Sequence, residues 1–459
     1  MGKQHTNKKK KVIKRVVIAA VSVIAVIVIG AGIYWFSMPK EQRNMLWFMV
    51  ASGESYDSYL EYQVIDRNEG PLAPTSFEPI AAVSSRGEDN MNIAVITEMV
   101  KNDTSSMMKK GNVQTIGVDD YTGWHLLADE GAAEGVNPYG PSPLSYYTSG
   151  LAANLHTQII KAAEVTAIEL DNVKVEVSNA FRWDDMISED GAGHLDVSTI
   201  NIIIESSASK EAIGEMIDIA MNGWAAGEAL KNETVIEPAL VVNGDNWDTY
   251  RSVPGSSSSD ESVVDELILS SVTDLPRVPE YLEQTVEEED ESLFPLLPDM
   301  SNMRFDIFAI SESAGSSERP YLKRITLSTP SAETWEIYSD EFMGDDDMPV
   351  APTSLEYFTA GTALCLTSQT TLVGAMMGLE FTEYRVENQT DYRQEHIGTP
   401  QMESFADTVH SYILIESEES QERLEAFYNK SLSLCFAGEG LKNATDMDIT
   451  LYVNGDILN

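Results

Sequence analysis

Cysteine and histidine are scarce in this chain, which has two cysteines and six histidines among 459 residues. So few cysteines exclude the disulfide-dense class of small secreted domains. The sequence also has no His-Glu-x-x-His motif, no close Cys/His spacing, no glycine-rich phosphate loop and no nucleophile elbow. Because these are the usual patterns of metal, phosphate and serine-hydrolase sites, we expect neither a metal ion nor a cofactor.

Basic residues are far outnumbered by acidic ones outside the N-terminus. The first 16 residues hold seven of the 30 Lys and Arg and none of the 74 Asp and Glu, which leaves 23 basic against 74 acidic groups in the rest. The remainder therefore carries a net charge of about −51. Nucleic acid and anionic lipid headgroups are poor partners for such a surface.

The N-terminus is typical of a membrane anchor. A basic segment, residues 1–15, precedes an uncharged apolar run, residues 16–36, which is long enough to span a bilayer as a helix. A cleaved signal peptide is the alternative, but the end of the run offers no small-residue cleavage site. We expect a single-pass protein of the cell membrane, with residues 1–15 in the cytoplasm and the bulk of the chain extracytoplasmic.

An internal duplication dominates the remainder. Residues 91–248, the first half, match residues 303–459, the second half, at a constant offset of 211. The matching pairs of segments are 140–148 with 351–359, 202–206 with 413–417, 230–232 with 441–443, and 242–245 with 453–456. One register over more than a hundred residues argues against chance, so we predict two tandem domains. Residues 37–90 are interpreted as a stalk and residues 249–302 as an acidic linker.

Both halves show the same order of expected elements. Thr353 and Glu356 form a capping box, and the almost uncharged pattern that follows predicts a buried helix to about Leu379. Strands at 92–99, 113–118, 173–177, 199–205 and 238–242 in the first half correspond to strands at 304–310, 322–328, 384–387, 411–416 and 449–453 in the second. Amphipathic helices are expected at 210–221 and 419–434. Strands mixed with separated helices indicate an α+β fold.

The two cysteines occupy matching features of the second half only. Cys365 lies in the expected buried helix, and Cys435 ends the amphipathic one. The first half has Asn154 and Trp224 at the equivalent positions.

At these motifs the chain resembles the OsmC/Ohr family of thiol peroxidases. Residues 354–365 resemble the family's first motif, which leads from a helix start into a cysteine, and residues 435–441 resemble its second. In the first half, residues 142–154 and the acidic turn Asp129-Glu130 are similar to the family's pattern. The resemblance implies two OsmC-like domains, with curved antiparallel sheets around central buried helices, that form a pseudo-dimer within one chain.

The resemblance also implies a chemistry. Cys365 would attack an organic hydroperoxide, Cys435 would resolve the product to a disulfide, and an external dithiol would reduce it again. Asn154 and Trp224 would mark a degenerate second site. The family places an Arg and a Glu beside the reactive thiol; Glu356 is a candidate supporting residue, and no arginine stands at the expected spacing before Cys365.

A non-catalytic protein is the alternative. In this hypothesis the OsmC-like fold serves as an envelope or ligand-binding protein with an apolar small ligand, and Cys365 and Cys435 form a structural disulfide. The separation of the two sulfurs and the charges around Cys365 bear on the choice between these functions.

Overall fold

The structure is a computed structural model, and it describes residues 40, 43–44, 64–68, 70–72, 90–99, 107–130, 140–243, 270–271, 303–329, 334–343, 348–381 and 383–458. The predicted anchor at residues 16–36 and the segment before it lie outside these residues, as do most of the stalk and the acidic linker. Among the residues described, no helix is long and apolar enough to cross a membrane.

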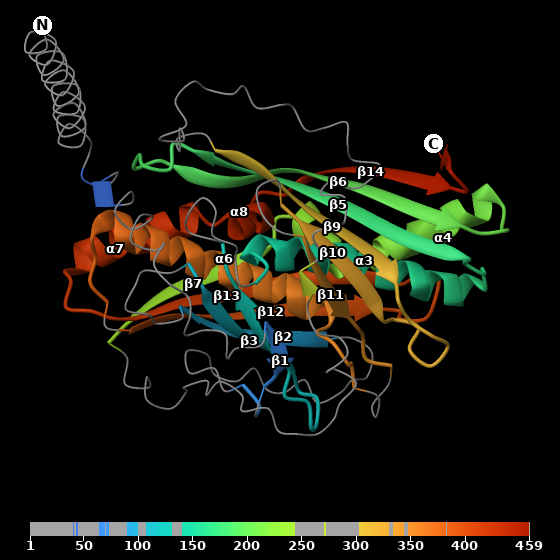
Figure 1. The fold of residues 1–459 in the computed structure, drawn as a ribbon, viewed down its shortest axis with the longest axis horizontal. Coiled ribbons are helices and arrows are strands. Elements are labelled where there is room, and N and C mark those ends of the chain that lie inside the picture. The colour runs from blue at the N-terminus through green and yellow to red at the C-terminus, as the bar shows by residue number, and fades with distance from the viewer. Residues whose placement is uncertain are drawn as a thin grey trace, which may run out of the picture.

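The fold is α+β, with helices packed between two mixed sheets (Figure 1). Sheet A has the order β1 (Ile65–Arg67), β4 (Trp124–Ala128), β3 (Lys109–Ile116), β2 (Asn90–Met99), β12 (Glu383–Glu395), β13 (Glu403–Glu416), β7 (Val235–Val242). Sheet B has the order β15 (Asp456–Leu458), β14 (Asp446–Val453), β6 (Ala192–Glu205), β5 (Asn172–Asp184), β9 (Arg304–Ser313), β10 (Lys323–Ser328), β11 (Trp335–Ser339), β8 (Ser270–Ser271).

Strands of the two halves are interleaved in both sheets. In sheet A, β2 of the first half pairs with β12 of the second, and β13 of the second half is followed by β7 of the first. In sheet B, β9 of the second half pairs with β5 of the first, and β14 of the second lies beside β6 of the first. Neither half therefore completes a sheet by itself.

The expectation of purely antiparallel sheets is wrong at one pair in each sheet. β7 runs parallel to β13, and β14 runs parallel to β6. Two helices lead from β6 of sheet B to β7 of sheet A, and two others lead from β13 of sheet A to β14 of sheet B. The members of each parallel pair are therefore not consecutive strands, and no tight hairpin forces them to run antiparallel.

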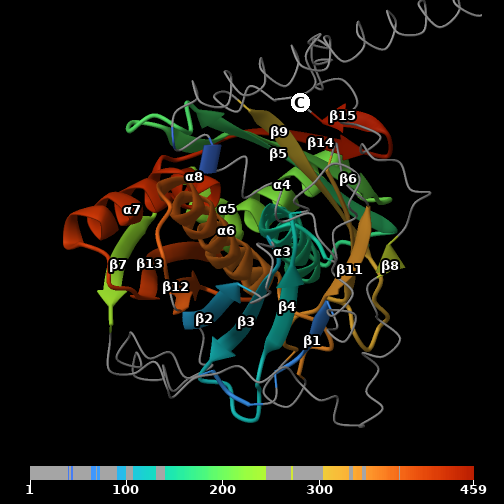
Figure 2. The same ribbon diagram turned by 60° about the vertical axis from the view of Figure 1, so that its left-hand side comes forward.

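Two long helices lie at the centre, α3 (Pro143–Thr166) and α6 (Ser354–Met377), and each begins at a defined cap. Ser142 caps α3 ahead of a proline, while Thr353 and Glu356 form the predicted capping box of α6. Most of their side chains are buried, because a sheet covers each side of the helix pair (Figure 2). The prediction of a buried helix here is confirmed.

Glycines set the distance between these two helices. A Cβ on Gly361 of α6 would lie 2.3 Å from the backbone nitrogen of Tyr147, and a Cβ on Gly150 of α3 would lie 2.4 Å from that of Phe358. Only a residue without a side chain permits such an approach of two backbones. The helices therefore cross in contact at Gly150 and Gly361.

Four further helices of the part that the structure describes also recur with an offset of 211. They are α4 (Lys210–Asn222) and α5 (Ala225–Lys231) in the first half, and α7 (Gln421–Ser433) and α8 (Phe436–Lys442) in the second. The seven-residue helices α5 and α8 were not expected from the sequence, nor were the strands β4 and β11. β5 and β12 are longer than predicted and contain a register shift, which interrupts the alternation of apolar and polar residues.

Candidate active site at the cysteine pair

The two cysteines lie side by side as free thiols. Cys365, in the middle of α6, and Cys435, at the start of α8, have their sulfurs 3.7 Å apart, with the Cys435 thiol donating to Cys365. Their exposed fractions are 1% and 3%. Because a disulfide bond measures about 2.05 Å, a small movement would join the two sulfurs.

The start of α8 is directed at both sulfurs. Cys435 is the N-cap of this helix, and its Sγ accepts a hydrogen bond from the backbone of Gly438 at 3.4 Å. The backbone N–H of Ala437 hydrogen-bonds to the sulfur of Cys365 and lowers the pKa of its thiol. Free N–H groups at a helix start stabilise negative charge, so they favour a thiolate here.

The net effect of the surroundings on Cys365 is nevertheless in the opposite direction. Burial raises the pKa of the Cys365 thiol well above its usual range, and the hydrogen bond shared by the two sulfurs, negative charge on Cys435 and the charge of Glu130 raise it further. Cys365 is therefore a thiol at neutral pH.

A buried lysine balances Glu130. Lys109, at the start of β3, is fully buried, and its Nζ lies 3.3 Å from a carboxylate oxygen of Glu130. The other oxygen accepts a hydrogen bond of 2.7 Å from Ser368, three residues beyond Cys365 on α6. The first half thus contributes a lysine that pairs with Glu130, the carboxylate whose charge acts on Cys365. Its spacing in the sequence carried no signal, because Lys109 precedes Cys365 by 256 residues.

Aromatic rings close the site on the side of Cys435. Phe436, the next residue, packs against Trp183 at a ring distance of 4.9 Å, against Phe305 at 5.4 Å and against Phe181 at 5.7 Å. The sulfurs therefore lie in apolar surroundings built from both halves.

Glu356 belongs to a different cluster. Its carboxylate accepts hydrogen bonds from the backbone and hydroxyl of Thr115, from the hydroxyl of Tyr121 and from the backbone of Thr353. It precedes Cys365 by nine residues on α6, which is roughly 13 Å along a helix. A supporting role for Glu356 at the thiol stays a prediction; the structure brings Glu130 to the cysteines instead.

The equivalent positions of the first half are filled by hydrogen-bonded side chains. Asn154 donates to the hydroxyl of Ser354 at 3.0 Å and accepts from the backbone of Ala226 at 3.1 Å. The indole N–H of Trp224 donates to the backbone oxygen of Leu151 at 3.1 Å. Both side chains are buried, so this second site is packed shut.

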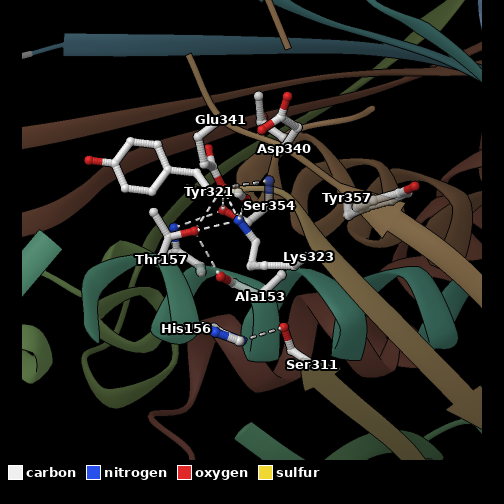
Figure 3. Close-up of polar contacts among 12 residues, drawn as sticks. Ala153, His156, Thr157, Ser311, Tyr321, Lys323, Asp340, Glu341, Ser354 and Tyr357 are labelled. Carbon is white, nitrogen blue, oxygen red and sulfur yellow. Dashed lines mark hydrogen bonds and ion pairs between the residues drawn. The ribbon is translucent and has the colours of Figure 1, made fainter. Parts of the chain in front are cut away.

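A polar network next to Asn154 corresponds to the Lys109–Glu130 pair (Figure 3). Lys323 is fully buried and donates to the hydroxyl of Thr157 at 2.8 Å and to the backbone oxygen of Tyr321 at 2.6 Å. Its Nζ lies 3.5 Å from a carboxylate oxygen of Glu341, and that oxygen accepts a hydrogen bond of 2.6 Å from the hydroxyl of Ser354. The sheet registers make the two lysines equivalent, since Lys109 lies opposite Ala128 and Lys323 opposite Ser339.

His156 directly precedes Thr157 on α3, and its imidazole is neutral. Its two ring nitrogens are each 3.0 Å from a hydroxyl, that of Ser311 and that of Ser313. Burial lowers the pKa of His156 to about 3, with the charge of Lys323 as a second cause. A neutral imidazole between two serines is a structural arrangement.

Two surface pockets lie away from the cysteine pair. The larger, of about 660 Å³, is lined by residues of the α3–β5 connection with Ser313 and Pro320. The smaller, of about 330 Å³, has Trp224 in its wall and lies beside the filled second site. Neither is lined by Cys365 or Cys435.

Comparison with known proteins identifies part of the chain. Residues 344–450 match the family model described as OsmC-like protein, and they include both cysteines. No curated protein matches. A solved structure that is similar is an OsmC-like hydroperoxide resistance protein from Jannaschia sp. CCS1, with 19% identity over 33% of this chain and 96% of that one, and a TM-score of 0.23. Residues 344–450 are therefore an OsmC-like domain.

Proposed function

We propose that the OsmC-like domain works as a thiol-dependent reductase of organic hydroperoxides, with Cys365 as the attacking and Cys435 as the resolving cysteine. The observation that carries this proposal is the distance of 3.7 Å between two reduced, buried sulfurs. Two thiols at this distance can exchange with a disulfide without rearrangement of the fold.

The reaction balances with these two groups and a dithiol. Cys365 attacks the terminal oxygen of the hydroperoxide ROOH, an S–O bond forms, the O–O bond breaks, and the alkoxide leaves as ROH with the proton that the thiol gives up. Cys435 then attacks the sulfenic sulfur, an S–S bond forms, and the S–O bond breaks to release water. An external dithiol reduces the disulfide and becomes oxidised itself.

The geometry supports an organic substrate in preference to hydrogen peroxide. Both cysteines belong to the buried apolar core, and Phe181, Trp183 and Phe305 pack on Phe436, the residue after Cys435. An alkyl or aryl group gains from transfer into such surroundings, whereas hydrogen peroxide has no apolar part to transfer.

The charges around Cys365 predict a pH dependence for this activity. Its pKa is raised, so the attacking thiolate becomes more abundant as the pH rises above the usual range of a thiol. The N–H groups of Ala437 and Gly438 then stabilise the anion that forms on either sulfur.

A peroxidase assay tests the proposal on the full chain in detergent. The wild type should consume cumene hydroperoxide when a dithiol such as dihydrolipoamide is supplied, and Cys365→Ser should abolish the turnover. Cys435→Ser should react once and leave a sulfenic acid that dimedone traps. Asn154→Ser, a change at the matching position of the other half, should retain turnover. A wild type without turnover, or turnover that survives Cys365→Ser, would refute the proposal.

The same proposal includes the architecture and the location of the protein. We propose that residues 91–248 and 303–459 are tandem OsmC-like units that pair as a pseudo-dimer, and that residues 16–36 anchor them outside the cell membrane. The interleaved strands and the recurrence of elements at an offset of 211 support the pairing. Extraction from membranes by carbonate, or a chain protected from protease added to intact cells, would contradict the anchor and its orientation.

A non-catalytic role is the second candidate, and the burial of both sulfurs favours it. A structural disulfide between Cys365 and Cys435 would leave the fold to bind an apolar ligand. Mass spectrometry of the native protein distinguishes the two functions: a bridge that resists dihydrolipoamide, together with a bound lipid, supports this candidate, and a bridge that opens and re-forms with hydroperoxide excludes it.

A further inference from the structure

Tyr147 carries an unused hydroxyl in the interior of the protein. This residue of α3 is fully buried, and among the residues that the structure describes its hydroxyl has no hydrogen-bond partner. A buried polar group without a hydrogen-bond partner lowers the stability of the fold, so its presence needs an explanation.

The crossing of the two central helices brings Tyr147 to the cysteine pair. Its backbone touches α6 at Gly361, and Cys365 follows one turn later on the same face. The ring stacks on Phe358 at 4.5 Å and lies 6.4 Å from Phe181, which in turn packs on Phe436 next to Cys435. Tyr147 is therefore connected through Phe181 to the rings that pack on Phe436, next to Cys435.

The electrostatics agree with this placement. Burial raises the pKa of Tyr147 well above its usual range, and negative charge on Cys365 or Cys435 raises it further. The effect of both sulfurs on its pKa agrees with a hydroxyl that lies near them, and the raised pKa keeps this hydroxyl protonated at neutral pH.

The other half provides an internal comparison. Residue 358 is the counterpart of residue 147 at the offset of 211, and it is a phenylalanine. Its backbone lies against Gly150, four residues before Asn154, which takes the place of a cysteine. The neighbouring pair, Tyr146 and Tyr357, keeps its hydroxyls and satisfies both, with the backbone oxygens of Leu127 at 2.7 Å and Tyr338 at 2.8 Å. The one unpartnered hydroxyl of these four rings is the one beside the sulfurs.

We propose that Tyr147 is a further catalytic residue, the donor that hydrogen-bonds the alkoxide oxygen of the hydroperoxide while its O–O bond breaks. This inference rests on the proposed function. Negative charge grows on that oxygen as Cys365 attacks, and a donor already oriented in apolar surroundings stabilises it. The oxygen takes up the proton released by the Cys365 thiol, so Tyr147 ends the step unchanged.

The test compares two tyrosine variants of the full chain, each with one hydroxyl removed. Tyr147→Phe reproduces the residue of the other half and removes an unpartnered group, so the variant should be at least as stable as the wild type. Its kcat/KM for cumene hydroperoxide should fall about 10- to 100-fold, the usual effect of losing a hydrogen bond to a charged group. Tyr146→Phe removes a satisfied hydroxyl, so it should lower stability and keep kcat/KM.

Each outcome has a distinct meaning. A stable Tyr147→Phe variant with unchanged kcat/KM overturns this inference, and the proposed function survives if Cys365→Ser is inactive in the same assay. Equal losses in Tyr147→Phe and Tyr146→Phe assign the effect to packing and also overturn it. A wild type without turnover removes the proposed function, and the inference falls with it.

Discussion

Replacing Gly361 with alanine tests whether the central helices are held in contact by the absence of side chains. The added methyl group would lie 2.3, 2.6 and 2.7 Å from the backbone nitrogen, the Cα and the Cβ of Tyr147. Ordinary contacts begin at 3.4 Å, so the two helices must separate by about 1 Å at their crossing. Backbone atoms cannot rotate out of the way, which removes the cheapest form of relief.

The expected effect is the difference of two opposing contributions. Overpacking of a well-packed core costs about 1–3 kcal/mol, and a backbone clash belongs at the upper end of that range. Alanine is favoured over glycine in a helix by about 1 kcal/mol. The net loss should be about 2 kcal/mol, or roughly 3 °C in Tm if the two interleaved halves unfold together, since the unfolding entropy grows with chain length.

Urea denaturation of the full chain measures this loss, and two further alanine variants serve as references. Gly150→Ala places its methyl group 2.4 Å from the backbone of Phe358 and should cost as much. Gly214→Ala lies in α4, where the nearest atom is 3.7 Å away, so the gain in helix propensity should prevail and stabilise the chain. Gly361→Ala as stable as Gly214→Ala would show that the helices do not cross in the way described.

Three further predictions concern single groups. The rate at which iodoacetamide alkylates Cys365 should keep rising above about pH 8.5, the usual pKa of a thiol. Glu130→Gln should shift this pH–rate curve to lower pH, because the charge of Glu130 is one cause of the raised pKa of Cys365. An unchanged curve would contradict an effect of Glu130 on the thiol. The pKa of His156 is lowered from 6.5 to about 3, so the neutral, buried imidazole contributes to stability above pH 6.5. That contribution is lost as the pH falls from 6.5 towards 3, by up to about 1.4 kcal/mol per pH unit. The urea midpoint of His156→Asn should therefore vary less with pH than that of the wild type, and identical pH profiles would contradict this role of His156. Trp224→Ala should cost about 3–5 kcal/mol of unfolding free energy, and a loss below 1 kcal/mol would mean that the second site is not packed shut.

Local signals in the sequence predicted local structure. Thr353 and Glu356 marked the start of α6 correctly, because a capping box involves only four residues and their own backbone. The seven residues of α8 were too few to show a helical period, so Cys435 was not recognised as an N-cap. The helix that directs N–H groups at the sulfurs therefore appears only in the structure.

Long-range contacts could not be predicted from the sequence, for a different reason. The exchange of strands between the halves depends on pairings such as β2 with β12, and no spacing along the chain encodes them. For the same reason the spacing of basic residues before Cys365 gives no sign of Lys109, which lies on β3 and is brought to the second half by the pairing of strands from both halves. Tyr147 was visible in principle, since the halves differ at residues 147 and 358 by a single hydroxyl, but the sequence does not say which helix faces which cysteine.

The two sites differ in how well their buried polar groups are hydrogen-bonded. Beside Asn154 and Trp224 the buried lysine, Lys323, has two hydrogen bonds in addition to its carboxylate, and the facing ring, Phe358, has no polar group to satisfy. Beside the cysteines, among the residues described, the ammonium of Lys109 has its carboxylate but no hydrogen bond, and the hydroxyl of Tyr147 has no partner at all.

Unsatisfied buried donors lower the stability of a protein. Replacing such a group with an apolar one of the same shape is nearly neutral or favourable, so a site that carries out no reaction can lose it by ordinary substitution. Beside the sulfurs, the ammonium of Lys109 and the hydroxyl of Tyr147 keep free hydrogen-bonding capacity among the residues described, as the proposed reaction requires of groups that bind an oxygen of the hydroperoxide. Ser339, opposite Lys323 in the other half, also has an unpartnered hydroxyl, so the difference between the two sites lies in the lysines and in the pair Tyr147 and Phe358.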